Sequence, residues 1–61
     1  MLMEITKFLR ETKMAEATFG RLVANDPRLV TDIRNGRVPR ERLAARIRAF
    51  MAAHSEEHSN G

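Results

Sequence analysis

The stretch EATFGRLVANDPRLVTDIRNG, residues 16–36, decides the fold because it places two short helical patterns on either side of one tight turn. The turn contains Asp26, a residue type that caps helix N-termini, followed by Pro27, which fits the first helical position. Asn25, just before them, is suited to a left-handed conformation. We therefore expect one helix from about Ala15 to Val23 and a second from Pro27 to Asn35.

Two glycines and two aliphatic residues indicate how these two helices approach each other, where the second one ends and which side of it faces the core. Gly20 falls in the middle of the first helix, at a cost of roughly 1 kcal/mol relative to alanine, which suggests that another backbone passes close by. Gly36 is placed to end the second helix in a left-handed conformation. Val30 and Ile33 are three residues apart, so we expect both to point into a core.

Helical spacing of apolar residues continues on both sides of this stretch. It runs from about Leu2 to Lys13 and again from about Pro39 to Ala53, and no alternating pattern predicts a strand. The sequence thus predicts an all-α fold, a small bundle of four to five short helices. We expect one domain over residues 1–53 and a disordered C-terminal tail over residues 54–61.

The charged residues of the 61-residue chain favour an anionic partner. The net charge is +3, and nine of the eleven basic residues are arginine, whose planar guanidinium matches phosphate and the edge of guanine. Five of the arginines lie between Arg37 and Arg48, with Glu41 as the one acid among them. The alternative interpretation is a solvated helix face, which is how most charge runs are used.

Several classes of protein are disfavoured by composition. The chain has no cysteine, no apolar run of the roughly 20 residues that span a bilayer, and no phosphate-binding glycine loop. His54 and His58 are four residues apart, but no third metal ligand is fixed near them. We expect a cytoplasmic protein with no cofactor and no metal, which does not act on membranes and is not an enzyme.

Apolar, small and turn residues follow one another in a fixed order from Phe19 to Ile47. The order is Phe19-Gly20, Val23, Val30, Ile33, then Asn35-Gly36 and a basic loop to Pro39-Arg40, and finally Leu43 with Ile47. Over about Ile5 to Met51 the chain resembles the lambda-repressor-like family of helix-turn-helix proteins. It departs from the family at Ala24 and Asn25, where a turn glycine and an apolar residue are usual.

This resemblance implies sequence-specific binding of double-stranded DNA by a small transcription regulator of bacterial or phage type, with helix 27–35 in the major groove. It implies that the bases are contacted by Pro27, Arg28, Thr31 and Asp32, and that the DNA backbone is contacted by Asn35, Arg37 and Arg40. An alternative for Asp32 is a salt bridge with Arg28, one helical turn away. Arg42, Arg46 and Arg48 are assigned to a solvated face, because the last helix of such proteins lies away from the DNA.

The resemblance also implies a two-fold homodimer that binds half-sites roughly 34 Å apart. Candidate dimer residues are apolar residues that the core does not need, although ordinary packing is an alternative for each: Leu29, Met51, Met3 and Leu22. An alternative function is a helix-turn-helix adaptor or inhibitor that binds a protein partner. An exposed apolar patch that joins Leu22 to Leu29 would favour that function.

Overall fold

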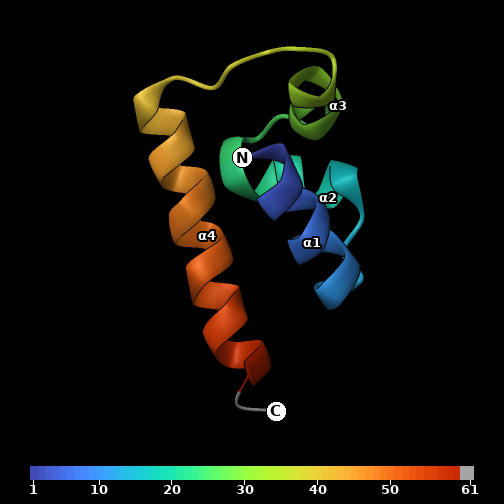
Figure 1. Cartoon of the computed structure of the whole chain (residues 1–61), viewed down its shortest axis with the longest axis vertical. Helices are drawn as coiled ribbons and strands as arrows, with labels where there is room; N and C mark the ends of the chain where they lie inside the picture. The colour runs from blue at the N-terminus through green and yellow to red at the C-terminus, as the bar shows by residue number, and fades with distance from the viewer. Residues whose placement is uncertain (60–61) are drawn as a thin grey trace.

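Four helices make up the described part of the chain, which in this computed structural model is the backbone of residues 1–59 and the side chains of residues 1–54. They are α1 (Leu2–Thr12), α2 (Glu16–Ala24), α3 (Leu29–Arg34) and α4 (Glu41–Ser59). No strand occurs among the described residues, so the prediction of a small all-α bundle is confirmed. In Figure 1, α4 runs along one side of the molecule and the three shorter helices gather on the other.

Each of the four helices contributes to one hydrophobic core. Both α1 and α2 pack against α3 and α4, so that α3 is held by two helices. The buried residues are Ile5, Phe8, Leu9, Phe19, Val23, Leu29, Val30, Ile33 and Ile47. The expected inward direction of Val30 and Ile33 is therefore confirmed, and no polar or charged side chain of the described residues is buried with them.

Three phenylalanines join α1, α2 and α4. The ring centroids of Phe8, Phe19 and Phe50 lie 5.4 to 6.0 Å from one another at steep angles. Edge-to-face pairs of this kind add about 0.5–1.5 kcal/mol beyond the burial of their area. This cluster fixes the long α4 to the pair α1 and α2 at one end of the core.

His54 adds a fourth ring to this cluster. Its ring centroid lies 4.1 Å from that of Phe50, and its Nδ1 lies 3.1 Å from the Phe50 carbonyl oxygen. We expected the last helix to end near Ala53, but α4 extends to Ser59 and His54 packs on it. The backbone of residues 54–59, which we had placed in a disordered tail over 54–61, thus belongs to α4. Residues 60–61 lie outside the described residues, so for them the disordered tail stays a prediction.

Left-handed residues end the first two helices. Lys13 closes α1 with a φ of 58°, and Asn25 closes α2 with a φ of 55°, the conformation that we predicted for Asn25. Gly36, after α3, has a φ of 109°, which a residue with a Cβ rarely adopts. The sequence did not single out Lys13, because lysine has no special preference for this conformation.

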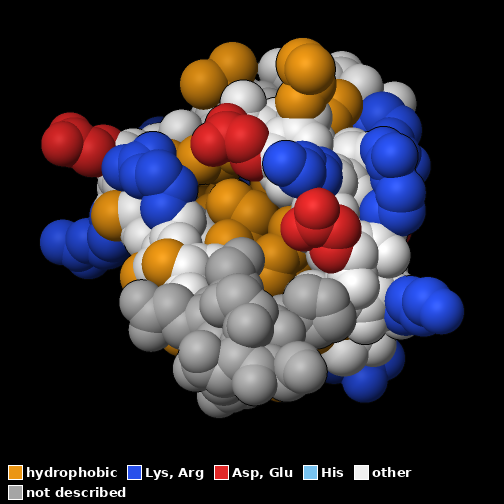
Figure 2. All heavy atoms as spheres, turned by 60° about the horizontal axis from the view of Figure 1, so that its bottom comes forward, with side chains coloured by type: hydrophobic (Ala, Val, Ile, Leu, Met, Phe, Trp, Pro, Cys, Tyr) orange, Lys and Arg blue, Asp and Glu red, His pale blue; other side chains and the backbone are white. Residues whose placement is uncertain are grey.

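The large hydrophobic side chains that remain exposed are Met3, Leu22 and Val38, among the described residues. Leu29 is fully buried, so it is a core residue and cannot serve as the dimer contact or patch residue that we considered. Figure 2 shows hydrophobic side chains in the middle of the face at the bottom of Figure 1, with charged side chains around them. None of the described helices is both long enough and apolar enough to cross a membrane.

Gly20 lets the turn before α3 pass directly over α2. The backbone N–H of Asp26 donates a hydrogen bond to the Gly20 carbonyl oxygen at 3.1 Å. A Cβ placed on Gly20 would overlap the carbonyl oxygen of Asp26 and lie 3.2 Å from the Cβ of Leu29. The close backbone approach inferred from this glycine is present, and it sets the distance between α2 and α3.

We predict that Gly20→Ala destabilises the protein by at least about 2 kcal/mol, because the methyl group displaces the turn by more than the better helix propensity of alanine, about 1 kcal/mol, can offset. The free energy of unfolding from urea denaturation, followed by circular dichroism, measures this. Thr18→Ala, at an exposed position of α2, is the control and should change it by less than about 0.5 kcal/mol. Equal stability of both variants would show that the turn adjusts freely.

Candidate nucleic-acid interface

Asp26 organises the turn that leads into α3. Its carboxylate Oδ1 accepts a hydrogen bond from the Arg28 backbone N–H at 3.0 Å, and its carbonyl oxygen accepts one from the Leu29 N–H at 3.1 Å. The prediction that Asp26 caps this helix, with Pro27 at its first position, is wrong: Pro27 and Arg28 form a turn, and α3 begins at Leu29 with Arg28 as its N-cap. The Asp26 carboxylate closes that turn instead. The recognition helix that we expected over 27–35 is thus a six-residue helix with a turn at each end.

The outward side of α3 and its two turns carries the residues that we expected to contact DNA. Leu29, Val30 and Ile33 point into the core, so the helix repeat turns the intervening side chains outward. Exposed on this side are Pro27, Arg28, Thr31 and Asn35, with Asp32 half-buried among them. We call this surface the α3 face: Pro27, Arg28, Thr31, Asp32 and Asn35.

Arg37 forms ion pairs with two carboxylates, those of Asp26 and Asp32. Its Nη1 lies 3.3 Å from Asp26 Oδ2 and 3.4 Å from Asp32 Oδ2, and its backbone N–H donates a hydrogen bond to the Asp32 carbonyl oxygen at 2.9 Å. The salt bridge that we considered between Asp32 and Arg28 is not formed; Arg37 is the partner instead. Arg37 therefore ties the loop after α3 to the turn before it.

The pairing of Arg37 changes the electrostatics of the α3 face. Carboxylates repel the phosphates of DNA, but one guanidinium here balances the charge of two of them in part. In the described part of the chain no acidic side chain lies within 4 Å of Arg28, so its guanidinium remains available to a ligand. All three paired side chains are more than one-third exposed, so these ion pairs are weakened by salt.

Arg34 lies on a different side of α3 from Arg28. Its Nη2 is 2.6 Å from Oε2 of Glu16, the first residue of α2. This contact joins the end of α3 to the start of α2 and gives Arg34 a structural partner. Sequence reasoning missed the pair, because residues 18 positions apart have no fixed spacing that would indicate contact.

The two other residues predicted to contact the DNA backbone flank α3 on its C-terminal side. The Asn35 backbone N–H donates hydrogen bonds to the carbonyl oxygens of Thr31 and Asp32, and the Asn35 side chain is exposed. Arg40 precedes α4, and its carbonyl oxygen accepts the N–H of Ala44 at 2.8 Å. Both side chains are exposed, so the loop from Asn35 to Arg40 presents polar groups beside the α3 face.

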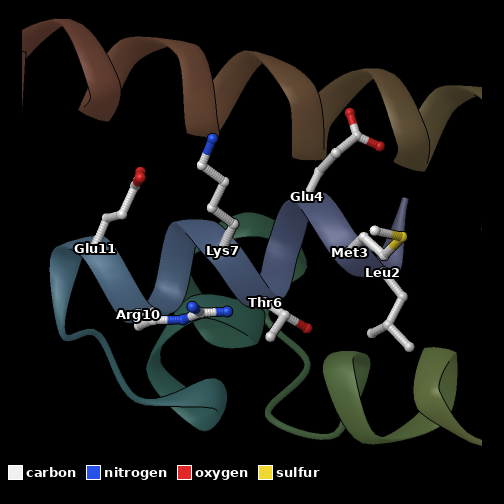
Figure 3. Close-up of a pocket in the computed structure, with 7 residues that line it drawn as sticks. All are labelled: Leu2, Met3, Glu4, Thr6, Lys7, Arg10 and Glu11. Carbon is white, nitrogen blue, oxygen red and sulfur yellow. The ribbon is translucent and has the colours of Figure 1, made fainter.

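A shallow depression follows the outer surface of α1, and its lining residues are drawn in Figure 3. All of them come from α1 itself: Leu2, Met3, Glu4, Thr6, Lys7, Arg10 and Glu11. In that view Glu4, Lys7 and Glu11 point to one side of the helix, whereas Thr6 and Arg10 point to the other. Because the polar groups do not converge on a common point, we assign no binding role to this depression.

No group of three or more histidine, cysteine, aspartate or glutamate side chains is arranged to hold a metal ion within the described residues. His54, one of the two histidines considered as ligands, packs on Phe50 as described above. His58 lies outside the residues whose side chains are described.

Two variants of Asp26 separate its hydrogen bond to the Arg28 N–H from its ion pair with Arg37. Asp26→Asn keeps an oxygen acceptor for the Arg28 N–H and loses the charge, so we predict a loss of less than about 0.5 kcal/mol. Asp26→Ala loses both interactions and should cost about 1 kcal/mol or more in the free energy of unfolding. Urea denaturation of the two variants measures the difference. Equal losses would show that the ion pair with Arg37, rather than the hydrogen bond to the Arg28 N–H, holds the turn.

Comparison of the chain with protein-family models, with curated protein sequences and with solved structures gave no significant match.

Proposed function

We propose that this protein binds double-stranded DNA in a sequence-specific manner, with α2 and α3 as a helix-turn-helix and the α3 face in the major groove. The observation that carries the proposal is the exposed Arg28, which has no acidic partner within 4 Å in the described part of the chain. It lies directly before α3, a short helix whose opposite side is buried in the core. A helix of about 10–12 Å diameter fits a major groove that is about 12 Å wide.

The residues of the α3 face suit base edges. Arg28 can donate two hydrogen bonds to O6 and N7 of a guanine, and the methyl group of Thr31 can contact that of a thymine. Pro27 would lie beside them at the entry of the helix. Asp32 is half-buried and pairs with Arg37, so we propose that it mainly holds the loop after α3 in position. Its direct contact with DNA would be to accept a hydrogen bond from the amine of a cytosine.

Contacts with the DNA backbone would come from the loop after α3. Asn35 and Arg40 are exposed and can donate to phosphate oxygens. Arg37 would have to share its guanidinium between a phosphate and the two carboxylates that it already holds. We therefore rank Arg40 above Arg37 as a phosphate contact, a distinction that could not be drawn from the sequence alone.

A six-residue helix covers too few base pairs to select a site by itself. We propose that two copies bind a two-fold site, with half-sites roughly one helical turn of DNA apart, and that the protein acts as a cytoplasmic transcription regulator. With Leu29 buried, the exposed Met3 and Leu22 and the half-buried Met51 remain as dimer candidates. The adaptor or inhibitor alternative loses its favouring feature, because no patch can join Leu22 to Leu29.

We predict that Arg28→Ala weakens binding to a preferred duplex, selected from a random pool, by about 5- to 150-fold, the equivalent of about 1–3 kcal/mol for one bidentate base contact. Binding to unselected duplex should fall much less, because phosphate contacts dominate it. Fluorescence anisotropy with the two labelled duplexes at one fixed salt concentration measures both affinities.

Arg10→Ala, which removes an exposed arginine of α1, is the charge-matched control and should weaken binding to both duplexes slightly and equally. The proposal is contradicted if the folded wild-type protein binds no duplex at low salt. It is also contradicted if Arg10→Ala and Arg28→Ala reduce selectivity to the same extent.

A further inference from the structure

A basic hollow lies at the start of α4, beside the loop that follows α3. Four of its six lining residues are arginines: Arg37, Val38, Arg40, Arg42, Leu43 and Arg46. Arg42 and Arg46 belong to α4 and are one helical turn apart, so they lie on the same face of that helix. From the sequence we expected both on a solvated face.

The positive charge in this basic hollow is largely unbalanced. Arg37 has its two carboxylate partners, but no acidic side chain of the described residues lies within 4 Å of Arg40, Arg42 or Arg46. Like charges one turn apart on a helix repel each other and destabilise it. An anion between the guanidinium groups of Arg42 and Arg46 would remove this repulsion.

Two apolar side chains complete the lining of the basic hollow: Val38, which is 85% exposed, and the half-buried Leu43. A surface that gathers one sign of charge raises the local concentration of counter-ions. Guanidinium groups also bind phosphate through two parallel hydrogen bonds, so phosphate is the anion that this lining suits best.

The basic hollow adjoins the α3 face. Arg37 lines the hollow and also contacts Asp32 of the α3 face and Asp26 in the turn before it, so one residue connects the two surfaces. A helix in the major groove is flanked by the phosphates of both strands, because the groove is scarcely wider than the helix. Side chains next to the α3 face are therefore in the place where a phosphate chain would run.

We infer that the basic hollow binds phosphate groups of the DNA backbone, and that Arg42 and Arg46 make α4 part of the DNA-binding surface. This inference rests on the proposed function. The inference adds a second DNA-binding element, α4, to the proposed interface. The loop after α3 separates this element from the residues proposed to contact the bases. The same chemistry would bind a free polyphosphate, so the test must separate the two sources.

The test compares Arg42→Gln/Arg46→Gln with Arg10→Gln/Arg48→Gln, which removes the same charge from exposed arginines outside the basic hollow. We measure binding of unselected duplex across a salt series. Each lost phosphate contact reduces the slope of log K against log salt by about 0.9, so the first variant should lower the slope by about 2. The second variant should leave the slope nearly unchanged, and Arg42→Lys/Arg46→Lys should restore it in large part.

Each other outcome has a defined meaning. Equal slopes for the two glutamine variants, with duplex binding and Arg28-dependent selectivity intact, overturn the inference and leave the proposed function standing. Absence of duplex binding by the folded wild type overturns both. Inorganic pyrophosphate, titrated against the backbone amide signals of residues 37–46, tests the second source. If pyrophosphate binds there while the duplex slopes of the two variants are equal, the basic hollow is a site for a small phosphorylated molecule.

Discussion

The contact between Gly20 and Asp26 is the constraint on which the rest of the structure depends. With no side chain on Gly20, the turn lies against α2 closely enough for the Asp26 N–H to reach the Gly20 carbonyl oxygen. This closeness allows a six-residue α3, too short to be stable by itself, to bury three of its six side chains. The direction of the α3 face follows from that packing, and so does the side on which Arg28 is exposed.

The ends of α3 are held by charge as well as by packing. Arg37 reaches back to Asp26 and Asp32, and Arg34 reaches across to Glu16 at the start of α2. Each of these exposed ion pairs is worth at most about 1 kcal/mol, so the hydrophobic core remains the main source of stability. Their effect is geometric: they limit the positions that the loop after α3 can take, and thereby fix where its basic residues lie relative to the α3 face.

Local chemistry explains which parts of the structure could be predicted from the sequence. The helix periodicity, the left-handed Asn25, the turn at Asp26 and the need for a close backbone at Gly20 all depend on residues near one another in the chain. The misses have two causes. The ion pairs of Arg34 and Arg37 and the burial of Leu29 depend on tertiary packing. The end of α4 was placed too early because the apolar residues that indicated this helix stop before His54, whose ring packs against Phe50.

The candidate site could be predicted from the sequence about as far as the fold could. Which side chains of the α3 face point outward follows from the helix repeat once Val30 and Ile33 are placed in the core. Which arginines are free to meet a ligand does not, because that depends on where the acids lie in space. The sequence presents the arginines from Arg37 to Arg48 as one basic run, whereas the structure pairs Arg37 with two carboxylates and shows no ion pair for the others within its described part.

The division of α3 into a core side and an outer side has a consequence for how such a protein can change. Leu29, Val30 and Ile33 carry the folding of this segment, while Arg28, Thr31 and Asn35 contribute no buried side chain to it. Substitutions on the outer side therefore leave the core intact, and a new binding preference can arise without a loss of stability. In a domain of 61 residues, with little stability to spare, this independence is what makes the surface of α3 evolvable.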